Sequence, residues 1–403
     1  MPQFIPVPID SMATPQTKQL YFNLHRLAQS KFTMFGHQDS LAYGRGWAKE
    51  HWNVGFPFNP NPNNAISDVY DTLDKKQYPG LFGWDIGHIE DPTKNALINY
   101  ITQNALKSYI KKVYDMGGVN TVCWHMNNPI DNSKTAWDSV VNSNGKNITL
   151  DILLDETQIN PATQQSYLQS FLRTLDVAAA FFKSLKGSDG NLIPIIFRPF
   201  HECSFGNCFW WNDSNSDKKN YKKLWTLTVD YLKNNCGVHN LLYAFNMHDN
   251  FTQNDFIKHY PDNGYVDIIS YDIYQQKAKS SASFIQEVQQ KTKLLIQLAQ
   301  NRNKVAAIGE IGYNNFMNQQ QKIDKKWFTK TLQPALANLQ IAYFMLWRNA
   351  KGKQIINGAT VFNDTDELNC TYPTHTTSAD FNEFFKARNI IFSKTTAARK
   401  MYL

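Results

Sequence analysis

The sequence has little cysteine and no long apolar segment. Its 403 residues include five cysteines, an odd number, with no Cys-x-x-Cys or Cys/His spacing typical of zinc sites. These absences exclude a disulfide scaffold, although Cys203 and Cys208 are close enough in sequence to bridge, a pairing that stays open. No apolar run is long enough to span a bilayer, so we expect no membrane insertion.

The positive charge is not concentrated anywhere. Lys and Arg exceed Asp and Glu by 41 to 34, but the longest basic clusters are pairs such as Lys111-Lys112. No basic stripe with interleaved aromatic residues occurs, so nucleic acid is not an expected partner. No linker or internal repeat is visible either, and we expect one domain over residues 1–403 that works as a monomer.

Aromatic residues, by contrast, are abundant. They make up 14% of the chain, with ten Trp and nineteen Tyr. Aromatic rings serve as platforms for the apolar face of a sugar, and they also fill large cores. Composition leaves both interpretations open.

Short apolar runs recur along the whole chain, separated by segments of helical spacing such as 164–184 and 283–301. Continuous runs such as Ile193–Phe197 suit strands that are buried on both faces, as in a parallel sheet. Eight β/α repeats predict an α/β fold, a single (β/α)8 TIM barrel, with a doubly wound open sheet as the alternative. The predicted strands are 32–35, 81–85, 120–124, 194–200, 241–246, 267–271, 305–310 and 342–347.

Polar residues follow these strands at their carboxyl ends, where TIM barrels carry their catalytic groups. A barrel designed only for packing has no reason to place them so regularly, so the pattern indicates a site. In chain order the strand-end residues are His37-Gln38-Asp39, Asp85 and His88, His125 with Asn127 and Asn128, His201-Glu202, Asn246, Asp272 and Tyr274, Glu310, and Trp347-Arg348.

Only two of the strand-end acids are glutamates, Glu202 and Glu310, on the fourth and seventh predicted strands. Across a barrel mouth two carboxyl groups can lie about 5 Å apart, the separation that double displacement at a glycosidic carbon needs. The aromatic loop after Glu202 would raise its pKa, which suits an acid/base. Glu310 then serves as the nucleophile, with Arg198 and Tyr274 as partners that keep it charged. The competing interpretation is that both are ordinary surface acids.

Three histidines, His37, His125 and His201, raise the alternative of a catalytic metal. His37 is followed by Gln38-Asp39 and not by the second His, two residues later, of a His-x-His pair, and no bridging carboxylate is evident. We therefore expect no metal and no cofactor, with the histidines bonding sugar hydroxyls or orienting the glutamates.

At these residues the chain resembles glycoside hydrolase family 26, a family of retaining barrels, nearly from end to end. The resemblance implies that Glu202 is the acid/base, Glu310 the nucleophile, and His201 a residue that contacts sugar and carboxylate. The segments that carry it are Phe35–Gly44, Ser67–Val69, Gly83–Gly87 with Glu90, Trp124–Pro129, Arg198–Glu202 with Phe209–Trp211, Ser270–Tyr274, Glu310, Trp347-Arg348 and the tail from Tyr372 to Phe381.

Further roles follow from the resemblance. Tyr274 corresponds to the residue that hydrogen-bonds the nucleophile, and Trp347-Arg348 to an aromatic platform and a substrate-binding arginine. Trp137 either stacks a sugar on the glycone side or covers the barrel. The expected substrate-binding residues are His125, Asn128, Trp137, Phe209, Trp210, Trp211, Asp272, Trp347 and Arg348.

The loop after Glu202 departs from the family pattern. It has one more residue before Gly206, and Cys208 stands where relatives carry a Trp that contacts sugar beside the cleavage point. Phe209, Trp210 or Trp211 could rotate into that role.

The resemblance implies a retaining endo-β-1,4-mannanase that acts on β-mannan polysaccharide or mannooligosaccharides. Mixed-linkage β-glucan and β-1,3-xylan are alternative substrates, and a non-catalytic sugar-binding barrel is an alternative class. The loop 51–64 could block one end of the cleft. No signal peptide precedes Met1-Pro2-Gln3, and secretion is expected from the chemistry alone.

Overall fold

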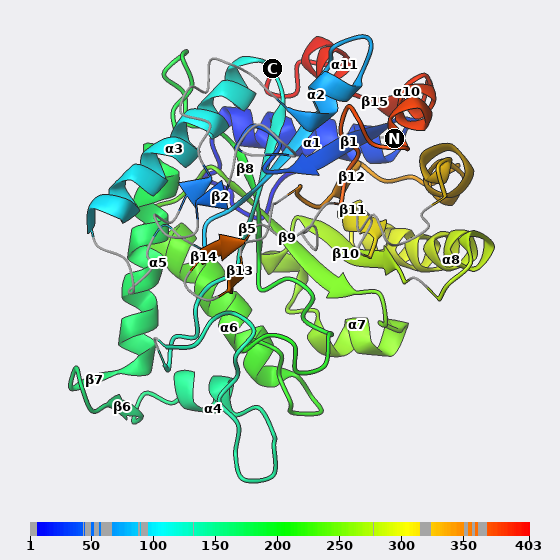
Figure 1. The fold of residues 1–403 in the computed structure, drawn as a ribbon. Helices are drawn as coiled ribbons and strands as arrows, with labels where there is room; N and C mark the ends of the chain where they lie inside the picture. The colour runs from blue at the N-terminus through cyan, green and yellow to red at the C-terminus, as the bar shows by residue number, and fades with distance from the viewer. Residues whose placement is uncertain are drawn as a thin grey trace.

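Eight parallel strands close into a barrel in the computed structural model (Figure 1). The model describes residues 6–42, 44, 50–51, 56–57, 67–87, 89, 96–131, 133–276, 278–314, 324–349, 354–356, 359–361 and 369–403. The barrel strands are β1 Thr33–Gln38, β4 Leu81–Asp85, β5 Val119–Trp124, β8 Ile195–Pro199, β9 Leu241–His248, β10 Ile268–Gln275, β11 Val305–Tyr313 and β12 Tyr343–Leu346. The predicted runs therefore fall on the observed strands.

The pairing of the first and last barrel strands decides between the two predicted architectures. β1 pairs in parallel with β12, with Met34 opposite Tyr343 and His37 opposite Leu346. This contact closes the sheet, so the barrel is confirmed and the open doubly wound alternative is wrong. A short strand, β15 Ile390–Ile391, adds to the outer side of β1.

Helices surround the strands, as Figure 1 shows for α3, α5, α6 and α8. Their buried faces carry the aliphatic and aromatic residues that pack on the sheet, such as Phe171 and Leu175 of α5. The helices are α1 Pro15–Ala28, α2 Asp68–Thr72, α3 Ala96–Asp115, α4 Thr149–Leu153, α5 Tyr167–Ser184, α6 Lys219–Asp230, α7 Gln253–His259, α8 Ser281–Gln300, α9 Gln333–Ala335, α10 Ser378–Phe385 and α11 Ser393–Ala398. Within the described part of the chain, no helix combines the length and apolar character of a membrane span.

Short hairpins and single turns complete the chain. Helix α5 begins three residues later than predicted, because Gln165–Ser166 forms strand β7 and the Ser166 side chain caps the helix at Gln169. The small strands are β2 Glu50–His51, β3 Phe56–Pro57, β6 Ile159–Asn160, β13 Gln354–Ile356 and β14 Ala359–Val361, and the other helical turns are η1 Tyr231–Asn235, η2 Asn263–Tyr265 and η3 Phe328–Leu332.

Some sequence predictions fall outside the described residues. Most of the loop 51–64, which could block one end of the cleft, lies outside the described residues. His88, Glu90 and Tyr43 lie outside them as well.

Candidate active site

The predicted site residues come together because the carboxyl ends of parallel barrel strands meet at one mouth. Glu202 follows β8, while Glu310 lies within β11 three residues from its end. Tyr274 belongs to β10, His125 follows β5, and Trp347 follows β12. Five neighbouring or facing strands thus contribute side chains to the same end of the barrel.

A β-bulge at Gly309 sets the position of Glu310. In the pairing of β10 with β11, Tyr271 lies opposite Ile308 and Asp272 lies opposite Glu310, so Gly309 is the extra residue. A Cβ atom at Gly309 would lie 2.5 Å from Asp272 Oδ1 and 2.6 Å from Asn246 Nδ2. Only glycine fits this close approach, and the bulge turns the next side chain toward the mouth.

Two partners hold the Glu310 carboxylate, and these are the two that the sequence suggested. The Arg198 Nη2 group donates to Glu310 Oε1, and the Tyr274 hydroxyl donates to Glu310 Oε2 at 2.6 Å. Both oxygens therefore accept a hydrogen bond, which fixes the plane of the carboxyl group.

Asp272 completes this buried network beneath Glu310. Arg198 Nη1 donates to Asp272 Oδ2 at 2.6 Å, and Asn246 Nδ2 donates to Asp272 Oδ1 at 2.8 Å. Burial raises the pKa of Asp272, and the charge of Glu310 acts in the same direction, while Arg198 opposes both. Asp272 is fully buried and holds Arg198, and its binding to substrate stays a prediction.

The backbone around Glu202 adopts an uncommon conformation. Phe200 and Glu202 have φ angles of 48° and 51°, in the left-handed region that non-glycine residues rarely enter. The Glu202 N–H donates to Asn246 Oδ1 at 2.8 Å, and Asn212 Nδ2 donates to the Glu202 carbonyl at 3.1 Å. Asn246 therefore connects the backbone of one glutamate to the network that holds the other.

Glu202 differs from Glu310 in its electrostatic surroundings. Burial raises the pKa of Glu202 well above its ordinary value, and the charges of Asp272 and Glu310 raise it further, against the opposing effect of Arg198. No cation contacts the Glu202 side chain in the described part of the chain. The mouth thus offers one carboxyl group whose pKa is raised and one whose two oxygens accept hydrogen bonds from Arg198 and Tyr274.

An aromatic wall lies on one side of the two glutamates and consists of His125, His201, Trp137 and Trp347, with Arg348 beside Trp347. His125 stacks on Trp137 with ring centroids 4.9 Å apart, and it forms an edge-to-face pair with Trp347 whose ring centroids are 5.9 Å apart. The Trp137 side chain is 55% exposed and Trp347 is partly exposed, so both can present a ring face to a ligand. The Arg348 guanidinium lies 5.8 Å from the Trp347 ring centroid.

The two histidines of this wall are held differently. His125 Nδ1 lies 2.6 Å from Asp85 Oδ2, which orients its ring and directs Nε2 away from that carboxylate. His201 is buried with its ring edge-to-face against His125 at 4.6 Å. Burial, with Arg198 and His125 adding to it, lowers the pKa of His201 well below its ordinary value, so this imidazole is neutral.

Trp210 and Trp211 do not reach the mouth. Both rings are fully buried, with Trp210 Nε1 donating to the Met126 carbonyl and Trp211 Nε1 to the His201 carbonyl, each at 2.8 Å. Stacking on a sugar needs an exposed ring face, which neither ring offers in this structure, where both brace the strand-end loops; their substrate-binding role stays a prediction. Phe209 stacks on Trp211 at 4.4 Å and is 3% exposed, which places it behind the wall.

Asn128 is also a structural residue. Its Nδ2 donates to the Asp138 carbonyl at 2.6 Å, and its Oδ1 accepts from the Ile130 N–H at 2.9 Å. The side chain is buried and bonded within its own loop, and its binding to substrate stays a prediction. Its effect is to shape the loop that carries Trp137.

The cysteines remain free thiols. Cys203 and Cys208, whose pairing was left open, are not bridged. Cys203 is buried with its Sγ 3.4 Å from Met247 Sδ, while Cys208 is partly exposed in the loop after Glu202.

One group of described residues, Asp85, Cys123 and His125, has donor atoms close enough together to be considered as metal ligands. Asp85 already accepts hydrogen bonds from His125 and from the Gly87 N–H, and the Cys123 Sγ lies 3.5 Å from the Trp84 carbonyl. Burial raises the pKa of the Cys123 thiol well above its usual range, which disfavours the thiolate that binds metals. Hydrogen bonding explains this cluster, and the absence of a metal stays a prediction.

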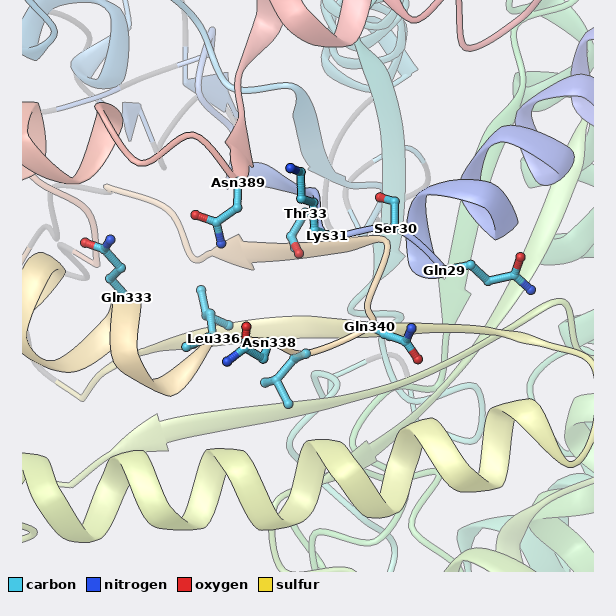
Figure 2. A pocket seen from close by; sticks show the side chains of 11 residues that line it. Gln29, Ser30, Lys31, Thr33, Gln333, Leu336, Asn338, Gln340 and Asn389 are labelled. Carbon is cyan, nitrogen blue, oxygen red and sulfur yellow. The ribbon is translucent and has the colours of Figure 1, made fainter.

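A cavity of about 540 Å³ lies at the opposite end of the barrel. Figure 2 shows amide side chains around it, including Gln333, Asn338, Gln340 and Asn389. Thr33, which also lines it, is the first residue of β1, so this cavity opens at the amino ends of the strands. It contains no carboxyl side chain and is separate from the candidate active site.

Comparisons with known proteins agree with this geometry. The family model described as glycosyl hydrolase family 26 matches residues 9–369. A mannan endo-1,4-beta-mannosidase from Bifidobacterium adolescentis is 32% identical over 356 residues, which cover 85% of this chain and 32% of that protein. A mannan endo-1,4-beta-mannosidase from Bacillus subtilis is 25% identical over 312 residues, covering 73% of each chain.

Solved structures give the same picture. A GH26 beta-mannanase from Bacteroides ovatus superimposes with a TM-score of 0.76 at 28% identity, covering 94% of this chain and 96% of that one. GH26C from Muricauda sp. superimposes with a TM-score of 0.78 at 27% identity, covering 98% and 96%. The chain spans about a third of the length of the Bifidobacterium adolescentis relative.

The buried Arg198 network yields a stability prediction. Arg198→Met removes the cation between two buried carboxyl groups while keeping most of the side-chain volume. Leaving those charges without their partner should lower the free energy of unfolding by about 3–5 kcal/mol, measured by urea denaturation. Arg173→Met is the matched control, because Arg173 is exposed and its guanidinium donates to Ser170 Oγ without a carboxylate partner among the described residues. Equal stability of the two variants would contradict the account.

Proposed function

Because the chain belongs to glycosyl hydrolase family 26, we propose that it cleaves the β-1,4-linked backbone of mannan, glucomannan or galactomannan at internal bonds with retention of configuration. The curated relatives from Bifidobacterium adolescentis and Bacillus subtilis carry the name mannan endo-1,4-beta-mannosidase, which supports the choice of substrate. The observation that carries the chemistry is the pair of glutamates with opposite surroundings at one barrel mouth.

The first step uses both glutamates at once. A Glu310 carboxylate oxygen attacks the anomeric carbon, and Glu202 gives its proton to the glycosidic oxygen as the bond to the leaving sugar breaks. The raised pKa of Glu202 keeps that proton available at neutral pH. The product of this step is a glycosyl ester on Glu310 and a free sugar chain.

The second step reverses the role of Glu202. Its carboxylate takes a proton from water, the water oxygen attacks the anomeric carbon, and the ester bond to Glu310 breaks. Arg198 and Tyr274 then receive the returning carboxylate in the orientation from which it started. Because both hydrogen bonds are already formed, little reorganisation is needed in either direction.

Binding of the sugar on the glycone side is assigned to the wall of His125, Trp137, Trp347 and Arg348. Trp137 and Trp347 provide ring faces, and the Asp85–His125 bond leaves the other nitrogen of His125 for a sugar hydroxyl. A non-catalytic sugar-binding barrel is disfavoured, because both glutamates and the partners that tune them are in place. Mixed-linkage β-glucan and β-1,3-xylan remain the alternative substrates for the same chemistry.

We also propose that the protein acts outside the cell and as a monomer. A polysaccharide is too large to enter a cell before it is cut, so an enzyme that cleaves its backbone must reach it outside.

The substrate proposal is tested with parallel reducing-sugar assays on locust bean gum, lichenan and β-1,3-xylan. Release from locust bean gum alone is expected, and Glu310→Ala should abolish it while mannooligosaccharide binding persists in calorimetry. Glu156→Ala, in an exposed loop, is the matched control and should keep the wild-type rate. Preferential release from lichenan or xylan would reject mannan as the substrate, and a Glu310→Ala variant with near-wild-type kcat would reject the nucleophile.

The raised pKa of Glu202 yields a prediction for pH dependence. The first step needs the protonated acid, so kcat/KM should hold through neutral pH and fall only as the pH passes the raised pKa. With Glu202→Gln, kcat/KM on mannan should drop about 100-fold or more. On a dinitrophenyl mannobioside, whose leaving group needs no proton, kcat/KM of the variant should no longer fall at alkaline pH. If kcat/KM of the variant still fell there as in the wild type, the fall would belong to a group other than Glu202.

A further inference from the structure

Phe205 is an exposed aromatic residue in the loop directly after Glu202. Its side chain is 38% exposed, unlike the buried Phe209, Trp210 and Trp211 of the same loop. Its ring stacks face to face on His248, with centroids 3.8 Å apart and planes within 5° of parallel. The ring is therefore backed on one face by an imidazole and partly accessible to solvent.

The stacked pair is anchored on both chain segments. The Phe205 N–H donates to the Glu202 carbonyl at 2.9 Å, in a tight turn that ends at Gly206 with φ 56°. The His248 N–H donates to Ser204 Oγ at 3.0 Å, which ties the end of β9 to this loop. These bonds fix the backbone of the loop that carries Phe205, and the stack on His248 holds the ring, so a ligand would have little left to order.

The strand order places this pair opposite the aromatic wall. Glu202 follows β8 and Glu310 lies on β11, and between these strands on one side are β9 and β10, with His248 at the end of β9. On the other side are β5, β4, β1 and β12, which carry His125 and Trp347. The line between the two glutamates therefore separates two groups of aromatic side chains.

A polysaccharide cut between the two glutamates must lie on both sides of that line. The acid/base protonates the oxygen of the leaving sugar, so this sugar lies beside Glu202, whose loop carries Phe205 three residues later. In the same loop Cys208 is a small thiol that offers no ring, and its N–H donates to the Phe205 carbonyl at 3.0 Å. Phe205 is the exposed ring on this side among the described residues.

We propose that Phe205, backed by His248, is the platform on which the first sugar of the leaving chain stacks. The inference rests on the proposed glycosidase function and adds the residue that binds the leaving-group side. The C–H face of a pyranose covers the exposed face of the ring, and the imidazole behind it keeps the ring from turning away. A pair that only packs the loop would leave substrate preference unchanged.

The test compares two substrates that share the glycone and differ in the leaving group. Mannopentaose places sugar on both sides of the cut, whereas β-mannobiosyl fluoride releases only a fluoride ion. In Phe205→Ala the ratio of kcat/KM for mannopentaose to that for the fluoride should fall about tenfold. Phe205→Leu, which keeps apolar volume without a ring, should lose nearly as much, and Phe205→Tyr should retain the wild-type ratio.

Two further variants separate stacking from general damage. His248→Ala removes the backing ring and should lower the same ratio by a smaller factor. Trp137→Ala lies in the opposite aromatic group and should lower both rates together, leaving the ratio near that of the wild type.

The outcomes keep the two proposals apart. A wild-type protein that cleaves both substrates, with Phe205→Ala losing both rates equally or neither, overturns the platform and leaves the function standing. A wild-type protein that cleaves neither overturns the function and the platform with it.

Discussion

The site depends on the ion pair of Arg198 with Glu310 and Asp272, which is buried at the carboxyl ends of β8, β10 and β11. A buried guanidinium between two carboxylates is favourable only when its geometry is fixed, because each charge has lost its hydration. The bulge at Gly309 provides that fixation by allowing Asp272 and Glu310 to approach from adjacent strands. The Glu310 side chain is consequently held in one orientation, which suits the nucleophile role proposed for it.

The same network also acts on the second glutamate, although it does not contact the Glu202 side chain. Burial raises the pKa of Glu202, the negative charges of Asp272 and Glu310 raise it further, and Asn246 bonds both Asp272 and the Glu202 backbone. The left-handed conformation of Glu202 costs free energy, on the order of 1–3 kcal/mol for such a residue, which these hydrogen bonds offset. One structural unit thus gives two identical side chains different surroundings, which is what the proposed double displacement requires.

The barrel and the two glutamates could be predicted from the sequence, because apolar runs mark buried parallel strands and few acids follow them. The orientation of the aromatic residues could not. Trp210 and Trp211 are close to Glu202 in sequence, yet their indole N–H groups donate to the buried carbonyls of Met126 and His201, and both rings lie in the interior. Trp137 and Phe205 face outward because of partners that lie in other loops or strands, His125 and His248. Asp272 looked like a ligand from its strand-end position, and only the register with Glu310 shows that it lies beneath the mouth.

The stereochemistry of the first product tests the central claim most directly. Proton NMR during the early hydrolysis of mannohexaose distinguishes the two anomers of the new reducing end before they interconvert. Two glutamates that act in double displacement predict that the β-anomer appears first and the α-anomer follows by mutarotation. Initial release of the α-anomer would mean a single displacement by water, and would contradict the assignment of Glu310 as a nucleophile held by Arg198 and Tyr274.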